Sequence, residues 1–266
     1  MDRWDGETLL RTHPLDGRTV PYAALMTGNL EAPALRVTVA DPAHAALIEQ
    51  VIRASFIAAP PEFAALLERD PVLARLNARY PGVRPVRQFD LLSALVRCIS
   101  AQQVNLRWAV TTRRRLAEAF GEPHHIGAHL VYSLNAKRLA EANVGEIRAL
   151  QFTTRKAEYL IAVAEAIAGG RLTMATLAAL PDEVVISRLV ALRGIGRWTA
   201  EWILARGLGR PCVVAGDLGV RKAVGLAYLD APLPPEAEVR RAVAHWGPSA
   251  GIAQALLLHG FAPPGE

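Results

Sequence analysis

The residues that point most clearly to chemistry lie in the stretch 192–199, where Gly194 and Gly196 stand one residue apart. The spacing of apolar residues predicts a helix on each side of this pair. Glycine accepts positive φ angles, and it lets backbone N–H groups approach an anion without a side chain in the way. The free N–H groups at the start of the second helix favour phosphate. The stretch therefore suggests a phosphate contact, although an ordinary tight turn between two helices would show the same pattern.

A carboxylate follows these glycines along the chain. Asp217 lies 21 positions after Gly196 (217 − 196), at the end of a loop that contains Gly and Pro and directly before a predicted helix. Aspartate is favoured at this N-cap position, where its carboxylate accepts hydrogen bonds from the first N–H groups of the helix. Taken alone, Asp217 is interpreted as such a cap. Taken with the glycine pair upstream, it is also a candidate for catalysis, and one side chain can serve both roles.

Several familiar sites are excluded by the sequence. The glycine pair follows a helix rather than a strand, which argues against a Rossmann dinucleotide site, and no Gly-Lys-Ser/Thr follows it, which argues against a P-loop. The chain has two cysteines, Cys98 and Cys212. Two thiols cannot make a four-thiolate zinc or iron–sulfur site, and they provide no disulfide framework.

The composition is typical of a protein that buries a core, since 52% of the 266 residues are hydrophobic and 21% are charged. Lys plus Arg number 30 and Asp plus Glu number 25, so the formal net charge is +5. This surplus permits a polyanionic partner without proving one. No apolar run reaches the roughly 18 residues of a membrane span. The polar N-terminus is unlike a secretory signal, so we expect no membrane partner and a cytoplasmic, nucleoid-associated location.

The first 40 residues are interpreted as a small antiparallel sheet. Leu35, Val37 and Val39 alternate with polar residues, which is the pattern of a strand. Asp16-Gly17 stands between two short apolar segments and indicates a hairpin. We expect residues 1–60 to form a small α+β N-terminal domain and residues 61–266 to form a helical body.

From residue 89 onward, apolar residues recur at three- and four-residue spacing, which predicts helices almost throughout. Gly121 is predicted to end one of them as a C-terminal cap. Beyond a first apolar stripe from Leu91 to Ile99, the predicted helices cover residues 108–120, 156–167, 182–192, 198–208, 218–228, 236–246 and 250–258.

Together, the glycine pair, the loop at 209–211 and Asp217 resemble the signature of the helix–hairpin–helix superfamily of DNA glycosylases. Within it, Gly-Ile-Gly-Arg-Trp-Thr-Ala at 194–200 is similar to the DNA-3-methyladenine glycosylase II branch. The resemblance covers about residue 35 to the C-terminus. It includes Ser100-Ala101-Gln102-Gln103, which matches the segment that family members insert into DNA. It implies a mainly α fold, a two-lobed helical bundle with a helix-hairpin-helix motif, preceded by a small truncated antiparallel β-sheet domain of α+β type.

By family position, Asp217 is the catalytic carboxylate. Such a group stabilises the positive charge that develops on deoxyribose as a base leaves, or it orients the attacking water. Family members that also cleave the strand carry a lysine after the hairpin as a Schiff-base nucleophile. Trp198 occupies that position here, and Lys222 lies elsewhere. The resemblance therefore implies a monofunctional hydrolase without lyase activity.

The presumed base pocket contains Trp198 and Trp202, which are four residues apart and share one helix face. An alkylated purine is cationic, and an indole face attracts it by about 0.5–2 kcal/mol per contact. We expect Trp198 to line the pocket, while core packing explains Trp202 equally well. The branch places a tryptophan–tyrosine pair near the chain end, where this sequence has Leu258 and His259. These two would line the pocket instead, although a lone histidine is more often structural.

The resemblance also implies double-stranded DNA as the partner, with the damaged nucleotide flipped out of the helix. Gln103 would be the wedge that fills the gap and Gln102 would assist it, although the sequence alone favours a solvated helix end for both. The residues expected to hold DNA phosphate are Gly194, Gly196, Arg197 and Thr199. The backbone of Arg193, Gly194 and Gly196 would hold a structural Na⁺ or K⁺, with no catalytic metal and no other cofactor.

The expected function is hydrolysis of the N-glycosidic bond of alkylated purines, such as 3-methyladenine and 7-methylguanine, by a monomer in the first step of base excision repair. Two alternatives stay open. One is a helix–hairpin–helix module that binds DNA without catalysis, and the other is a glycosylase for deaminated or oxidised bases.

Overall fold

The computed structural model describes residues 2–15, 18–29 and 31–261. The chain forms two compact units, each built from two segments. Unit 1 contains Met1–Arg53 and Gln88–Ile195, and unit 2 contains Ala54–Arg87 and Gly196–Glu266. This division differs from the boundary predicted at residue 60. The N-terminal sheet joins the first half of the helical body because apolar residues of the two pack together.

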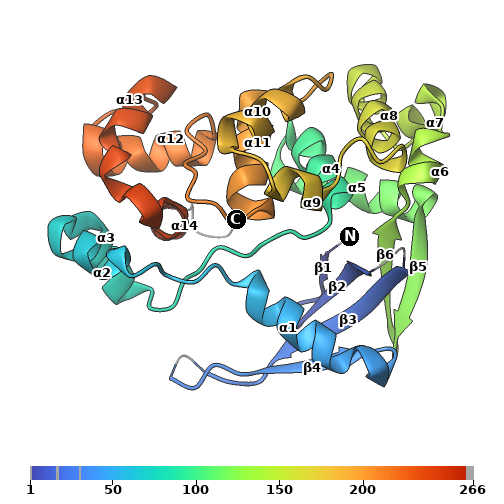
Figure 1. The fold of residues 1–266 in the computed structure, drawn as a ribbon, viewed down its shortest axis with the longest axis horizontal. Coiled ribbons are helices and arrows are strands. Elements are labelled where there is room, and N and C mark those ends of the chain that lie inside the picture. Colours follow the sequence, from blue (N-terminus) through green and yellow to red (C-terminus); the bar gives the residue numbers. More distant parts are fainter. Residues whose placement is uncertain (1, 16–17, 30, 262–266) are drawn as a thin grey trace. The chain divides into compact units, whose positions relative to one another are not determined.

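The sheet of unit 1 has four antiparallel strands in the order β1–β2–β3–β4. Their bounds are β1 (Arg3–Trp4), β2 (Thr8–Leu15), β3 (Arg18–Met26) and β4 (Leu35–Val39). Leu15 pairs with Arg18, so the predicted hairpin is present, while its turn residues Asp16 and Gly17 lie outside the described residues. Helix α1 (Ala45–Ser55) packs on this sheet through Ile48, which is fully buried against Val20 (Figure 1).

A second, two-stranded sheet stands where the sequence predicted only helices and a cap. Strands β5 (Gly121–Ile126) and β6 (His129–Leu134) pair antiparallel. Ile126 and Val131 share one buried cluster with residues of β2 and β3. Gly121 is the C-cap of α5, as predicted, and its extended backbone (φ −95°, ψ 179°) leads the chain directly into β5. A Cβ on Gly121 would lie 2.4 Å from the Ser133 carbonyl oxygen, so close approach of the strand explains this glycine.

Most remaining elements of unit 1 are helices with side-chain N-caps. Asp90 caps α4, Asn105 caps α5 and Thr153 caps α8 by accepting hydrogen bonds from first-turn N–H groups. The helices are α4 (Leu91–Ala101), α5 (Leu106–Phe120), α6 (Ala136–Ala140), α7 (Val144–Ala149), α8 (Thr154–Ala168), α9 (Met174–Ala178) and α10 (Asp182–Val190) (Figure 1).

Among the described residues of unit 2, the named elements are all helical, and one isolated β-bridge joins Phe56 to Val86. Its helices surround a core in which Trp246, Leu66 and Leu73 are almost wholly buried. They are α2 (Glu62–Arg69), α3 (Pro71–Arg79), α11 (Arg197–Trp202) with the π-helical turn Ile203–Gly207, α12 (Leu218–Val224) with the π-helical turn Gly225–Leu229, α13 (Glu236–Ala242), the 3₁₀ segment Ala244–Ser249 and α14 (Ala250–Gly260). Within the described part of the chain, no helix combines the length and apolarity that crossing a membrane requires.

Candidate functional site

The predicted hairpin is present, and Gly194 is the residue on which its shape depends. Gly194 has φ +85°, a left-handed conformation that favours glycine. A Cβ at this position would lie 2.1 Å from Cγ of Tyr159, so the tyrosine ring occupies the space that any side chain would need. The Gly194 carbonyl oxygen accepts a hydrogen bond from Nε2 of Gln102 at 3.0 Å. Both the backbone angle and the packing therefore require glycine here.

Gly196 differs from Gly194, because its backbone is extended (φ −95°, ψ 175°) and open to any residue. Apart from its chain neighbours, a Cβ at Gly196 would meet no heavy atom of the described residues within 4 Å, so there is room for a side chain. Gly196 is the N-cap of α11 and makes no side-chain cap. A glycine here leaves the first N–H groups of the helix uncovered. Thr199, another predicted phosphate contact, is only 1% exposed.

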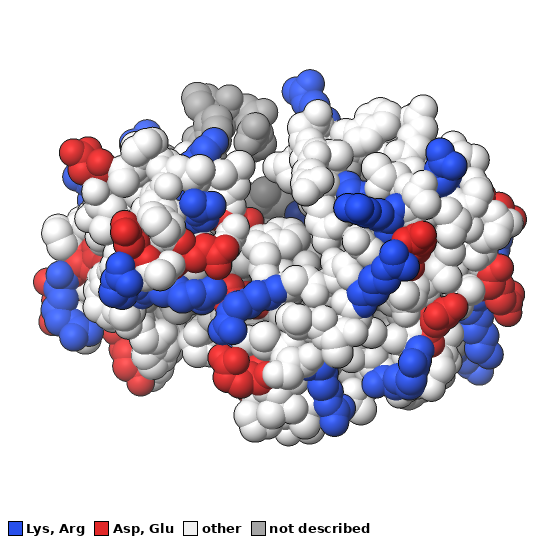
Figure 2. All heavy atoms as spheres, turned by 90° about the horizontal axis from the view of Figure 1, so that it is seen from above, with Lys and Arg blue, Asp and Glu red and all other residues white. Residues whose placement is uncertain are grey.

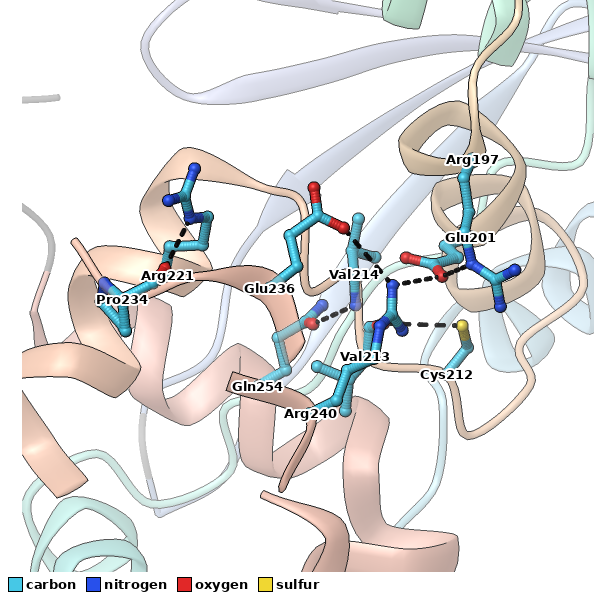
Figure 3. Close-up of polar contacts among 10 residues, drawn as sticks. All are labelled: Arg197, Glu201, Cys212, Val213, Val214, Arg221, Pro234, Glu236, Arg240 and Gln254. Atoms are coloured by element: carbon cyan, nitrogen blue, oxygen red, sulfur yellow. Dashed lines mark hydrogen bonds and ion pairs between the residues drawn. The ribbon is translucent and has the colours of Figure 1, made fainter. Parts of the chain in front are cut away.

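Arg197 begins α11 and is tied to a buried carboxylate. Its Nε donates to Oε1 of Glu201 at 2.8 Å, and the same oxygen accepts from Arg240 of α13 at 2.7 Å (Figure 3). Glu201 is 1% exposed, and its Oε2 has no hydrogen-bond partner among the described residues. In Figure 3 the outer nitrogens of Arg197 point away from Glu201. The guanidinium is thus held from one side by a residue of its own helix.

Asp217 adopts the predicted N-cap geometry. Its Oδ1 accepts from the backbone N–H of Val220 at 3.1 Å, at the start of α12. Its Oδ2 accepts from the indole Nε1 of Trp198 at 3.1 Å. Both donors are neutral, and the structure shows no ion pair for Asp217 among the residues it describes. The carboxylate is half-buried, and its two hydrogen bonds fix its orientation.

The loop before Asp217 is anchored from α14. The backbone N–H of Val214 donates to Oε1 of Gln254 at 2.8 Å, and the Val214 carbonyl accepts from the N–H of Asp217 at 2.9 Å (Figure 3). Gln254 is 8% exposed, so this hydrogen bond is shielded from water. The position of Asp217 therefore depends on a glutamine 40 residues away from Val214 in the sequence.

The two residues predicted near the chain end, Leu258 and His259, make different contacts. A Cβ on Gly219 would lie 3.1 Å from both Oδ1 of Asp217 and Cδ2 of Leu258, so Leu258 and the carboxylate flank the same position. The exposed ring of His259 packs edge-on against Tyr80, with 4.6 Å between ring centroids. Trp202 is half-buried on α11. Asp217, Trp198 and Leu258 are thus brought together, and His259 is engaged with Tyr80.

The predicted wedge residues lie just after α4 in unit 1. Gln103 is exposed and has φ +55°, which is uncommon for a residue other than glycine. Gln102 does not point to solvent as the sequence alone favoured, because its amide binds Gly194. Figure 2 shows acidic and basic side chains interspersed on the face it draws, so individual cations rather than a broad basic patch are the candidate DNA contacts there.

Three positioning residues were missed by the sequence reasoning. Glu201 stands four residues after Arg197, a spacing typical of ion pairs on one helix, so a local signal for it existed. Tyr159 and Gln254 carried no such signal, because their partners Gly194 and Val214 are distant in the sequence.

Comparisons with known proteins show the family to which the chain is similar. Residues 96–249 match the model of the HhH-GPD superfamily base excision DNA repair proteins. DNA-3-methyladenine glycosylase 2 of Escherichia coli (strain K12) is 33% identical over 137 residues, which are 51% of this chain and 47% of that protein. The chain spans about half the length of the curated relatives it matches.

Two solved structures share the fold. The 3-methyladenine DNA glycosylase of Archaeoglobus fulgidus superposes with a TM-score of 0.82 at 23% identity, covering 97% of this chain and 89% of that one. The Schizosaccharomyces pombe 3-methyladenine DNA glycosylase in complex with abasic DNA gives a TM-score of 0.58 at 25% identity, covering 69% and 88%. The family match extends over more than half of the chain, so this protein belongs to the HhH-GPD superfamily of base excision DNA repair proteins.

Proposed function

We propose that this protein is a monofunctional DNA glycosylase that hydrolyses the N-glycosidic bond of alkylated purines flipped out of double-stranded DNA. The observation that carries the proposal is the state of Asp217. Its carboxylate is half-buried and oriented by two neutral donors, the indole of Trp198 and the N–H of Val220. The names of the 3-methyladenine glycosylases to which the chain is similar support the substrate class.

Asp217 would act on the charge that forms at the sugar. As the base leaves, positive charge develops at C1′ of the deoxyribose, as in other glycosyl transfers. A carboxylate fixed beside that carbon stabilises the charge or orients the water that attacks it. Because both of its hydrogen-bond donors are neutral, the negative charge of Asp217 is available for this purpose, and its N-cap hydrogen bond prevents the side chain from turning away.

Trp198 and the chemistry of the base explain the preference for damaged purines. A purine alkylated at N3 or N7 is cationic, so an indole face attracts it and the base leaves without a general acid. Leu258 beside Asp217 would supply an aliphatic wall. His259, which packs edge-on against Tyr80, remains a proposed pocket residue.

The absence of lyase chemistry follows from the residue at the hairpin. A strand-cleaving enzyme needs an amine nucleophile there, and Trp198 has none. Lys222 is exposed on α12, after Asp217 in the chain, and is not assigned this role. The product would be an abasic site in an intact strand.

DNA would be held by the hairpin and by the wedge. Gln103 is exposed and would fill the gap that the flipped nucleotide leaves. The backbone N–H groups at Gly194 and Gly196, with Arg197, would bind one phosphate. The protein would work as a monomer in the cytoplasm, at the nucleoid.

A structural Na⁺ or K⁺ fits the hairpin backbone, because carbonyl oxygens are the ligands that hard cations prefer. The carbonyl oxygens of Gly194 and Gly196 each accept one hydrogen bond already, from Gln102 and from the N–H of Ala200. A carbonyl oxygen has a second lone pair, so both can also ligate a cation together with Arg193. The ion would supply positive charge beside the phosphate.

The test is base release from duplex DNA that contains 3-methyladenine, 7-methylguanine, hypoxanthine or ethenoadenine, followed by a search for strand breaks before alkali is added. We expect release of the methylated purines and no breaks. Release of hypoxanthine alone would favour a glycosylase for deaminated bases. Binding without release of any base would favour a DNA-binding module, and breaks without alkali would contradict the absence of lyase activity.

A further inference from the structure

Two cations converge on the last turn of α4, directly before the wedge residues. Nζ of Lys156 donates to the carbonyl oxygen of Ser100 at 2.9 Å, and NH1 of Arg113 donates to its Oγ at 3.2 Å. Ser100 is 1% exposed, so both hydrogen bonds end inside the protein. The end of a helix carries partial negative charge, which favours cations at this place.

Burying the positive charges of Arg113 and Lys156 at this place costs folding free energy. Burial, together with the smaller effect of the nearby positive charge of Arg97, lowers the pKa of Arg113 to about 10. Burial also lowers the pKa of Lys156. Among the described residues, neither Arg113 nor Lys156 forms an ion pair within 4 Å that would offset this cost. A function that needs the end of α4 to be rigid would account for retaining both cations.

The segment after α4, which contains Gln102 and Gln103, has a strained backbone and is also bound to the hairpin. Gln103 has φ +55°, a strained conformation for residues other than glycine that persists only where the surroundings enforce it. Its neighbour Gln102 donates to the Gly194 carbonyl at 3.0 Å, across 92 residues of sequence. The wedge backbone is therefore anchored at Ser100 on one side and at Gly194 through Gln102.

Helix α8 contacts both anchors. Lys156, which binds Ser100, and Tyr159, whose ring fills the space beside Gly194, are three residues apart and share one helix face. Between these two residues of α8, Glu158 forms an ion pair of 2.9 Å with Arg193, the residue before Gly194. The start of α8 thus touches the segment before the wedge and the hairpin together.

We propose that the start of α8 is a bracket that fixes the wedge to the phosphate-binding hairpin, with Lys156 as the positioning residue on the wedge side and Tyr159 on the hairpin side. This inference rests on the proposed function, because it assumes that Gln103 enters DNA. The bracket makes the two DNA contacts one rigid unit, so gripping the phosphate places the wedge at the base step to be opened.

The test is a double-mutant cycle read by wedge insertion and not by base release. The probe is a duplex that carries a tetrahydrofuran abasic analogue next to 2-aminopurine, whose fluorescence rises when its stacking is broken. Lys156→Met, Gln103→Ala and the double variant are titrated against it. We expect each single variant to weaken the fluorescence-detected binding by about tenfold, the worth of a hydrogen bond to a charged group, and the double variant to lose no more than either.

Two controls separate positioning from direct contact and from misfolding. Lys137→Met removes an exposed lysine of α6 and should leave the probe titration unchanged. Lys156→Arg keeps a cation at Ser100 and should restore insertion. If Lys156→Met folds poorly, Gln102→Ala replaces it in the test. This variant removes the other anchor and should show the same loss of insertion.

Two results would overturn the bracket. In the first, Lys156→Met weakens binding just as much in the Gln103→Ala background as in the unchanged protein, and it weakens binding to undamaged duplex equally. That result would make Lys156 a direct phosphate contact. The other is unchanged insertion in both Lys156→Met and Gln102→Ala. The abasic probe has no base to release, so the cycle is decided even if the protein proves to have no glycosylase activity.

Discussion

Two carboxylates of unit 2, Glu201 and Asp217, stand on either side of the same loop in the sequence and are treated differently by their surroundings. Glu201 is 1% exposed and accepts from two guanidinium groups, those of Arg197 and Arg240, on one oxygen. Asp217 is half-buried and, among the described residues, accepts from an indole N–H and a backbone N–H.

The difference shows how a fold assigns roles to identical functional groups. A carboxylate paired with two cations already has its charge balanced, and it joins elements that lie apart in the sequence, here α11 and α13. A carboxylate held by neutral donors keeps its charge for a reaction partner. On this basis we assign Glu201 a structural role and propose Asp217 as the catalytic group.

The largest effect is expected from Asp217→Asn. Asparagine is as good an N-cap as aspartate, so α12 should remain capped and the protein folded. Loss of the charge should lower the rate of base release by at least about 10²-fold, as for other groups that stabilise transition-state charge. Single-turnover release from DNA with 7-methylguanine measures it, and binding to abasic DNA is the control. Undiminished release by this variant would remove Asp217 from the mechanism.

Glu201→Gln is expected to act on stability instead of on rate. It leaves two guanidinium groups facing a neutral amide, and we expect about 2 kcal/mol less free energy of unfolding, because Arg197 and Arg240 are partly exposed and solvent screens them. Urea titration measures the loss. Glu236→Gln removes a longer, exposed pair of 3.7 Å with Arg240 and should cost under about 0.5 kcal/mol. A slower reaction at unchanged stability would contradict the structural role of Glu201.

Trp198→Phe is expected to slow the reaction about tenfold with little change in KM. Phenylalanine keeps an aromatic face for the base and loses the indole N–H that orients Asp217. Steady-state kinetics on alkylated DNA separate the two parameters. In the Asp217→Asn background the same change should have no further effect, and an additive loss there would mean that Trp198 acts on the base alone.

The smallest effect is expected from a third carboxylate of unit 2, that of Asp70. It is nearly as buried as Glu201 and more buried than Asp217. Burial would raise the pKa of Asp70, but hydrogen bonds from Leu73, His245 and Tyr228 outweigh it and hold the pKa below its ordinary value. A depressed carboxylate pKa stabilises the fold above the unfolded-state value and loses that contribution as the pH falls through the folded-state value.

The free energy of unfolding should therefore fall as the pH drops below about 4, and the fall should be shallower in Asp70→Asn. Denaturant titrations across that acid range measure the slopes. Equal slopes in the two proteins would show that Asp70 does not contribute to acid sensitivity.

Much of the fold and of the site could be predicted because it is local. The existence of helices α8 and α10 follows from apolar spacing, the start of α10 follows from Pro181, and the N-cap role of Asp217 follows from its place before α12. Helix α8 begins at Thr154, two residues before the predicted start at residue 156. The strands β5 and β6 could not be predicted this way, because Gly121 indicates only the end of α5 and gives no sign that it also pairs with Leu134 in a sheet.

The sequence by itself determined the helix pattern, the glycine pair and the carboxylate that follows it, since capping and helical periodicity act over three or four residues. The tertiary structure alone decided which side chains hold them. Gln102 reaches Gly194 across 92 residues, Gln254 reaches Val214 across 40 and Arg240 reaches Glu201 across 39. Contacts at such separation leave no periodic trace in the chain, because they depend on how distant elements pack and not on the turn of any one helix.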